Sequence, residues 1–291
     1  MKKFEFDSIG SHFEISIYDN IDDVFFEQIK SDILAWINDF DNKYSRFKDS
    51  SVVSFLNNKI GVFSVRDDFS EIMTWYFKLY KLSNHKFTPL IGSMLDDLGY
   101  DKNYTLIPKD KINNISDLYE SIKILDKNKI EIIKPVNLDF GGVGKGYCVD
   151  VIKSKLEKYN IKKFIVNGAG DIFYKTNDTE SIISGLENPN NFSQIIGTIN
   201  IKNQSICASS GSRRKWDKYH HIIDPDLKKQ NDEIVATWVI AENTLIADTI
   251  ATCLFMCSPE NFQNDFKFEY CILNKDMKIK KSNGFDAKFY Q

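Results

Sequence analysis

Asp248 and Thr252 are the first residues that suggest chemistry, because they lie four positions apart at the start of a predicted helix. At that spacing, two side chains project from the same face of a helix. A carboxylate and a hydroxyl are hard oxygen ligands of the kind that Mg²⁺ prefers in proteins. The same spacing also fits a simpler interpretation, in which Asp248 complements the helix dipole and Thr252 packs in the core.

A glycine-rich segment is the second candidate, Gly141-Gly142-Val143-Gly144-Lys145-Gly146. Backbone N–H groups that are free of side chains at a helix start can bind phosphate oxygens. The segment is not a P-loop, because Asp139 stands where that motif requires glycine. It is not the dinucleotide fingerprint either, because Tyr147 stands where that motif requires its last glycine. It is either a phosphate-binding loop of another kind or a tight structural turn.

Two adjacent histidines, His220 and His221, precede the turn-forming pair Asp224-Pro225. Histidine can accept a proton near neutral pH, so either residue could be a general base. Neighbouring side chains on a strand point to opposite faces, so at most one of the two points into a given site. The small residues at positions 207–212 are expected to form a loop before them, and surface histidines beside a turn are the alternative interpretation.

The elements that must position these residues follow from apolar periodicity. Antiparallel hairpins are predicted over residues 3–18, which turn at Ile9-Gly10-Ser11, and over residues 122–133, which turn at 126–129. Apolar residues at helical spacing predict helices over about 25–40, 68–82 and 244–257. A further helix is predicted to follow the turn of the glycine-rich segment and to reach about Tyr159.

A strand followed by a turn and a helix is predicted three times. The strands are residues 136–140 before the glycine-rich segment, 164–167 before Gly168-Ala169-Gly170-Asp171, and 236–240 before the helix at Thr244. No proline-rich or low-complexity linker separates these parts. The prediction is therefore an α+β fold, a single compact domain over residues 1–291 with pseudo-repeated, largely antiparallel sheets and packed helices.

Composition narrows the possible partners. The chain has 291 residues, of which 42% are hydrophobic and 27% are charged, as expected of a folded globular protein. A formal net charge of −3 provides no basic field for a nucleic-acid backbone or an anionic membrane, so neither partner is expected. No apolar run is long enough to span a bilayer, and carboxylates interrupt residues 1–7, so we expect no membrane insertion and a cytoplasmic protein.

Five sequence blocks, taken in their order along the chain, resemble the FAD:protein FMN transferase (ApbE) family, although each block alone is a weak signal. They are residues 44–57 with Tyr44-Ser45-Arg46-Phe47; 87–100 with Phe87-Thr88-Pro89-Leu90-Ile91-Gly92; 138–150 with the glycine-rich segment; 209–225 with His221-Ile222-Ile223-Asp224-Pro225; and 247–252.

This resemblance implies an enzyme that cleaves FAD, attaches FMN through a phosphoester to a Ser or Thr of a partner protein, and releases AMP. It implies Mg²⁺ bound by Asp248, Thr252 and the backbone carbonyl of Gly142. His221 matches the catalytic base, with an expected pKa near 7, whereas His220 does not align with it. The FAD-binding positions that it implies are Phe47, Lys86, Phe87, Thr88, Asp139, Lys145 and Ile223.

Departures from the family pattern are small. Ala169 replaces a usual second glycine, residues 226–229 replace a Thr-Gly turn, and Ala251 stands where some members carry an aspartate, which leaves fewer carboxylates for the metal. Two alternatives use the same residues: a Mg²⁺-dependent FAD pyrophosphatase that yields FMN and AMP without an acceptor, and a flavin-binding protein that leaves FAD intact.

Overall fold

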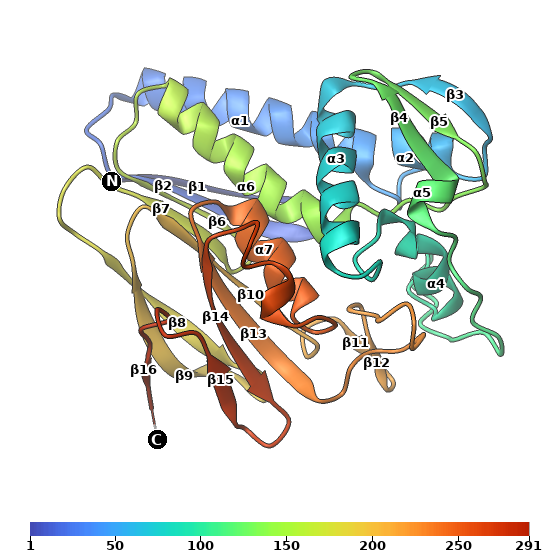
Figure 1. Ribbon diagram of the computed structural model, residues 1–291. Coiled ribbons are helices and arrows are strands. Elements are labelled where there is room, and N and C mark those ends of the chain that lie inside the picture. Colours follow the sequence, from blue (N-terminus) through green and yellow to red (C-terminus); the bar gives the residue numbers. More distant parts are fainter. Residues whose placement is uncertain (291) are drawn as a thin grey trace.

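An eight-stranded antiparallel sheet runs through the centre of the computed structural model, which describes residues 1–290 (Figure 1). Its strand order is β1-β2-β6-β7-β10-β13-β14-β15, so strands from both ends of the chain belong to one sheet. The bounds are β1 (Lys2–Ser8), β2 (Ser11–Ile17), β6 (Phe164–Gly168), β7 (Asp171–Lys175), β10 (Gln204–Ser210), β13 (Ile234–Ala241), β14 (Phe268–Asn274) and β15 (Ile279–Lys281).

Both faces of this sheet are buried, and strand β13 shows why. Trp238 and Ile240 pack in one apolar cluster, whereas Val239 and Ala241 pack in another. Successive side chains of a strand point to opposite faces. A strand that is covered on both faces therefore has a continuous apolar sequence instead of an alternating one.

Helices cover one face of the sheet, where the larger apolar cluster lies (Figure 1). They are α1 (Asp23–Tyr44), α3 (Asp67–Leu82), α6 (Gly141–Lys158) and α7 (Thr244–Cys253). Helix α6 contacts β6 and β7, and α7 contacts β10 and β13. The short helices α2 (Val52–Leu56), α4 (Gly92–Asp97) and α5 (Leu118–Ser121), with the 3₁₀ turns η1 (Pro89–Ile91) and η2 (Pro259–Asn261), connect the larger elements. Within residues 1–290, no helix has the length and apolar character needed to cross a membrane.

Three smaller sheets complete the fold. The sheet of β8 (Ile182–Asn188), β9 (Asn191–Ile201) and β16 (Lys288–Phe289) shares the second apolar cluster with the main sheet. The sheet of β3 (Gly61–Ser64), β4 (Ile122–Asp126) and β5 (Lys129–Ile132) lies near α3 (Figure 1). The hairpin of β11 (Lys215–Trp216) and β12 (Tyr219–His220) carries His220 and leads to His221. All strand pairs described are antiparallel.

The α+β class, both hairpins and the predicted helices are confirmed, but α6 already begins at Gly141, inside the segment predicted as a glycine turn. The strand predicted over residues 136–140 is wrong. Its backbone is hydrogen-bonded to loops instead of a sheet. Leu138 N donates to Asn57 Oδ1 over 2.8 Å, and Asp139 N donates to the Pro89 carbonyl over 2.7 Å. Apolar residues in this segment are buried without a neighbouring strand, so burial produced an apolar run that resembles a strand.

Three further predictions are corrected. The Gly168–Asp171 segment turns from β6 into β7 instead of leading to a helix, with φ values of 54° at Ala169 and 98° at Gly170. Small residues 207–210 belong to β10, not a loop, because α7 packs closely on them. Helix α7 ends at Cys253, four residues before the predicted end.

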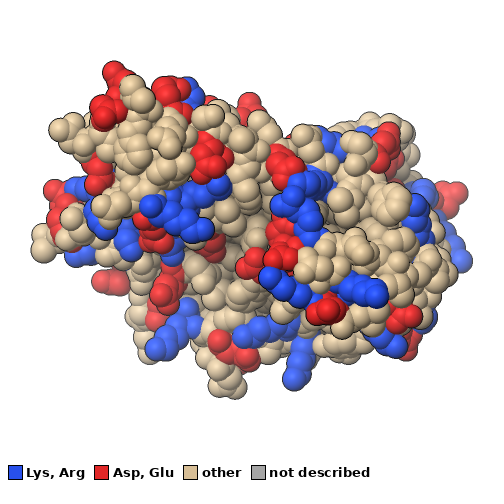
Figure 2. All heavy atoms as spheres, turned by 90° about the horizontal axis from the view of Figure 1, so that it is seen from above, with Lys and Arg blue, Asp and Glu red and all other residues tan. Residues whose placement is uncertain are grey.

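Figure 2 shows a face of the molecule on which acidic and basic side chains are interspersed.

Candidate active site

Helices α6 and α7 are joined at two points. The backbone N–H of Gly146 in α6 donates to Asp248 Oδ2 in α7 over 2.9 Å. The carboxylate of Asp150, one turn further along α6, accepts hydrogen bonds from the N–H groups of Thr244 and Leu245 at 2.8 and 2.9 Å. Asp150 therefore satisfies free N–H groups at the start of α7, and this pairing fixes where Asp248 lies.

The expected metal ligands contain oxygen donors that fit Mg²⁺. Asp248 is 5% exposed, and the Thr252 hydroxyl lies 3.2 Å both from the Asp248 carbonyl and from Ser209 Oγ on β10. Gly142 lies one helical turn before Gly146, whose N–H contacts Asp248. Carboxylate, hydroxyl and carbonyl oxygens are the donors that a hard cation prefers. Asp248 is the only carboxylate in this expected set, and among residues 1–290 no group of three or more His, Cys, Asp or Glu side chains has a metal-binding arrangement.

The ammonium group of Lys145 lies between two carboxylates. It forms an ion pair with Asp171 at the start of β7, and its Nζ atom is 3.3 Å from Asp248 Oδ1. Asp171 is 1% exposed, so its charge is removed from solvent. The predicted FAD-binding lysine and the predicted metal-binding aspartate are therefore in direct contact.

Asp139 is held from both sides. Its Oδ1 atom accepts a hydrogen bond from the N–H of Gly141 over 2.6 Å, and its Oδ2 atom lies 2.5 Å from Arg46 Nε. Arg46, whose side chain is 5% exposed, also donates to Asp96 Oδ1 over 2.7 Å and to the Tyr100 carbonyl over 2.5 Å. This network fixes the segment that leads into the first turn of α6.

Phe47 lies beside this network and is surrounded by aromatic rings. The Arg46 guanidinium is 4.4 Å from the centre of its ring. Tyr104 stacks on Phe47 with centroids 5.2 Å apart, and Tyr100 approaches edge-on at 5.9 Å. The Arg46 guanidinium and the Tyr104 ring therefore both contact the Phe47 ring.

Lys86, Phe87 and Thr88 join the glycine-rich turn to the loop that follows the histidines. Lys86 Nζ is 2.7 Å from Asp224 Oδ2, and although burial opposes its charge, the hydrogen bond with Asp224 raises the pKa of Lys86 overall. The Phe87 ring stacks on Tyr76 and lies where a side chain on Gly142 would stand, only 2.8 Å from the position of such a Cβ atom.

Thr88 and Ile223 serve packing and capping in this structure. Thr88 is 5% exposed, and its Oγ1 atom accepts a hydrogen bond from Leu90 N over 3.1 Å. Ile223 is 4% exposed and packs with Trp216 and Leu98 in a third apolar cluster. Neither side chain is free at the surface.

The environment of His221 differs from the prediction. Its Nδ1 atom is inaccessible to solvent and has no hydrogen-bond partner among the described residues. Burial lowers the pKa of His221 to about 3, and the nearby positive charges of Arg214 and Lys145 act in the same direction. The expected pKa near 7 is wrong for this structure, because loss of hydration disfavours the charged imidazolium.

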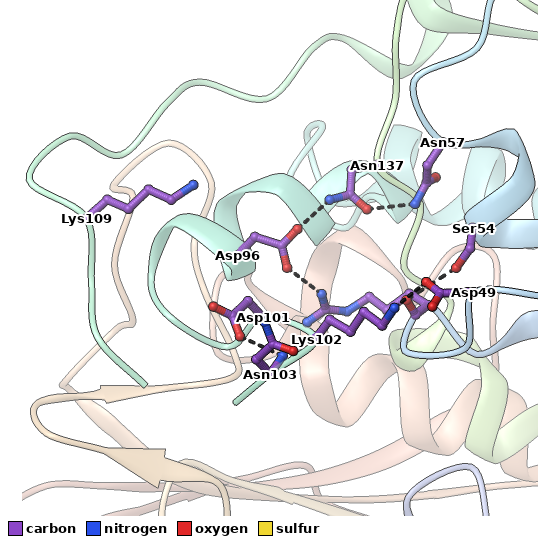
Figure 3. A pocket seen from close by; sticks show the side chains of 10 residues that line it. Asp49, Ser54, Asn57, Asp96, Asp101, Lys102, Asn103, Lys109 and Asn137 are labelled. Atoms are coloured by element: carbon purple, nitrogen blue, oxygen red, sulfur yellow. Dashed lines mark hydrogen bonds and ion pairs between the residues drawn. The ribbon is translucent and has the colours of Figure 1, made fainter. Parts of the chain in front are cut away.

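A polar pocket of about 370 Å³ is lined in part by Arg46, and Figure 3 shows Asn57, Asn137 and Asp96 around it. Asn57 donates to Asn137 over 2.9 Å, and Asn137 donates to Asp96 over 2.6 Å, so a chain of hydrogen bonds leads across the pocket to Arg46. None of the predicted site residues is among its lining residues. Charged groups converge instead at Lys145, Asp171 and Asp248, none of which lines this pocket. The lining residues are Arg46, Asp49, Ser54, Asn57, Asp96, Asp101, Lys102, Asn103, Lys109 and Asn137.

Four charged residues of this region received no role from sequence reasoning, namely Arg46, Asp150, Asp171 and Asp224. Each lies inside or next to one of the motifs, and this position is the only feature of the sequence that could have pointed to a role in the site. Their partners are far away in the sequence, so only the fold identifies them.

A model of the ApbE family matches residues 9–267, which is most of the chain. Among curated proteins, an FAD:protein FMN transferase of Buchnera aphidicola is 25% identical over 76% of this chain and 70% of its own length. One of Haemophilus influenzae is 23% identical over 79% of this chain and 72% of its own. One of Klebsiella pneumoniae is 29% identical, but the match spans 41% of this chain and 39% of that protein.

Solved structures share the fold at low sequence identity. The crystal structure of the ApbE protein of Thermotoga maritima has a TM-score of 0.86 and 20% identity, and the match covers 98% of this chain and 97% of that one. The flavin transferase ApbE of Vibrio cholerae has a TM-score of 0.76 and 17% identity over 98% of both chains.

Proposed function

The chain belongs to the ApbE family, and from this we propose that it catalyses the reaction for which its relatives are named, the transfer of FMN from FAD to a protein. The finer proposal is that FMN becomes attached through a phosphoester to a Ser or Thr of the acceptor, with release of AMP. Strands near both ends of the chain share one sheet, which supports residues 1–291 acting as one catalytic domain.

The observation that carries this proposal is the contact among Lys145, Asp248 and the first turns of α6. It brings an ammonium, a carboxylate and the N-terminal end of a helix together. An anionic diphosphate is stabilised by the ammonium and by the partial positive charge of the helix end. A carboxylate at the same place repels a diphosphate, and a divalent cation between them would offset this repulsion.

Mg²⁺ is the proposed cation, held by Asp248, by Thr252 and by the carbonyl of Gly142. When bound, it would neutralise charge on the diphosphate and on the departing AMP. Asp139 would contact FAD at the start of α6, where Gly141 and Arg46 hold its carboxylate.

The remaining steps use the side chains of this chain. Lys145 binds the diphosphate, and Phe47 contacts the isoalloxazine ring. His221 accepts the proton of the Ser or Thr hydroxyl while that oxygen attacks the FMN-side phosphorus. A new P–O bond forms to the acceptor, and the bond between the two phosphates breaks so that AMP departs with the electron pair.

The low pKa of His221 is compatible with this role. A pKa of about 3 keeps the imidazole neutral at pH 7, which is the form that can accept a proton. A nearby negative charge favours the protonated form, so a diphosphate bound at Lys145 would raise the pKa of His221 and make it a stronger base.

Intact-mass analysis of a flavin-acceptor domain tests the proposal. Mixing it with the protein, FAD and Mg²⁺ should add one FMN and release AMP, and replacing the acceptor Ser or Thr by Ala should prevent the addition. Release of FMN and AMP at the same rate without any acceptor would identify a pyrophosphatase instead, and FAD that stays intact would identify a flavin-binding protein. The cytoplasmic location of the enzyme and its acceptor stays a prediction, which cell fractionation tests.

A further inference from the structure

Lys145 has two anionic partners with different surroundings. Asp248 has an additional hydrogen bond from the Gly146 N–H to its Oδ2 atom. Apart from the Lys145 ammonium at Oδ2, the carboxylate of Asp171 has no hydrogen-bonding partner among the described residues, and Asp171 is 1% exposed. The ammonium of Lys145 is therefore the group that compensates the buried charge of Asp171.

The backbone around Asp171 holds this carboxylate in place. Asp171 pairs with Gly168 across the turn that joins β6 to β7. Ala169 and Gly170 adopt φ values of 54° and 98°, and Asn167 Oδ1 accepts the N–H of Gly170 over 2.8 Å. A hydrogen-bonded turn fixes the start of β7, so Asp171 presents a fixed negative charge to Lys145 from the sheet below α6.

A carboxylate that is paired with an ammonium is a poorer ligand for a metal ion, because the two cations compete for the same charge. Lys145 lies within reach of Asp248, so it is a potential competitor of the metal. Before FAD binds, Asp171 is the second anionic partner of Lys145, and its carboxylate draws the ammonium toward itself.

We propose that Asp171 is a positioning residue that draws the Lys145 ammonium toward itself, weakens the ion pair of Lys145 with Asp248 and thereby keeps Asp248 available to bind a divalent cation. The inference rests on the proposed metal site of the FMN transferase. It assigns Asp171 no contact with the metal, so its effect should depend entirely on Lys145.

The expected cation affinities of the Asp171 and Lys145 variants follow from this dependence. In Asp171→Asn the ammonium loses its anionic partner and pairs with Asp248, which should weaken divalent-cation binding by about 10- to 100-fold, the usual effect of losing a supporting residue around a metal site. In the double variant Asp171→Asn/Lys145→Met the competing ammonium is absent, so the cation affinity should return to within about threefold of the wild-type value. This difference is smaller than the loss of about 10- to 100-fold expected in Asp171→Asn.

Titration with Mn²⁺, with free ion measured by electron paramagnetic resonance, tests this without any turnover. The full-length wild-type protein, both single variants and the double variant are compared with and without FAD. Thermal unfolding of each variant is recorded, because Lys145→Met leaves the Asp171 charge buried and should unfold at a lower temperature, whereas the double variant removes both charges. Asp178→Asn is the matched control, because it removes an exposed carboxylate partner of Lys163 beyond the other end of β7 and should not alter Mn²⁺ affinity.

Weak binding in Asp171→Asn that is restored in the double variant supports the inference. Unchanged affinity in Asp171→Asn overturns it, and so does a double variant that binds as weakly as Asp171→Asn, which would make Asp171 a ligand instead of a positioning residue. A wild-type protein that binds no Mn²⁺ with or without FAD overturns the proposed metal site itself, and is thereby distinguished from failure of the inference alone.

Discussion

Asp248 on α7 is hydrogen-bonded through Oδ2 to the backbone N–H of Gly146 on α6, at 2.9 Å. This contact requires the two helix backbones to lie very close together. A Cβ atom on Gly146 would stand 2.8 Å from the Cα atom of Leu245 and 2.8 Å from the carbonyl oxygen of Thr244. The position of the proposed metal ligand therefore depends on a residue without a side chain in the neighbouring helix.

Gly146→Ala should separate α6 from α7, because the atoms it meets belong to backbone that cannot rotate away. We expect a loss of about 1–3 kcal/mol in the free energy of unfolding and weaker metal binding. Gly144→Ala is the matched control in the same helix, since no atom lies within 4 Å of the added Cβ and helix propensity favours alanine by up to about 1 kcal/mol. Denaturant unfolding of both variants measures this, and equal stability of the two would refute the close-approach argument.

Asp248→Asn should remove metal-dependent turnover while the fold is retained, because the amide can still accept the hydrogen bond from Gly146. We expect kcat to fall by about 10²- to 10³-fold or more, as several kcal/mol of charge stabilisation are lost. The assay is AMP release as a function of Mg²⁺ concentration. A variant with an unchanged Mg²⁺ dependence would show that the metal binds elsewhere.

His221→Gln should slow transfer by about 10²- to 10⁴-fold, the usual contribution of a general base, and leave FAD affinity nearly unchanged. FAD fluorescence titration and single-turnover AMP release separate the two effects. His220→Gln is the control, because the His220 ring instead accepts a hydrogen bond from the Ile222 N–H through Nδ1 at 3.2 Å. Equal rate losses in both variants would argue against a specific role for His221.

Acid should destabilise the protein through its buried histidines. Burial lowers the pKa of His220 to about 4 and that of His221 to about 3, from an ordinary value of 6.5. Between these values the unfolded chain binds more protons than the folded one, so stability is fully present above pH 6.5 and falls as the pH drops toward 3. Denaturant unfolding at several pH values should show a shallower decline in His221→Gln, and an unchanged slope would contradict the low pKa.

Arg46→Met should destabilise the segment that leads into α6. The change leaves the carboxylates of Asp96 and Asp139 without their shared guanidinium, and breaking one side of a buried ion pair costs about 3–5 kcal/mol. The Asp139 side chain is 14% exposed, so water compensates little for the loss of its partner. The Asp96 side chain is 31% exposed, so water compensates more there, and the total loss in unfolding free energy should lie near the lower end of that range. Arg46→Lys is the comparison: one ammonium cannot make the three contacts of the guanidinium, so only partial recovery of the unfolding free energy is expected.

Local pattern was sufficient for much of the fold. Apolar residues at helical spacing located α1 and α3, and Gly10 located the turn of the first hairpin. The spacing of Asp248 and Thr252 placed both on one helix, and the order of the motifs indicated the family. These features are encoded in neighbouring residues, so no knowledge of distant contacts was needed.

Tertiary structure alone decided which charged groups meet. Lys145 and Asp171 are 26 positions apart and Arg46 and Asp139 are 93 apart, and no short-range pattern pairs them. The apolar segment 136–140 looked like a strand because burial, which depends on the whole fold, selects apolar residues in loops as well. The low pKa of His221 has the same origin, since desolvation comes from atoms that packing brings around the ring.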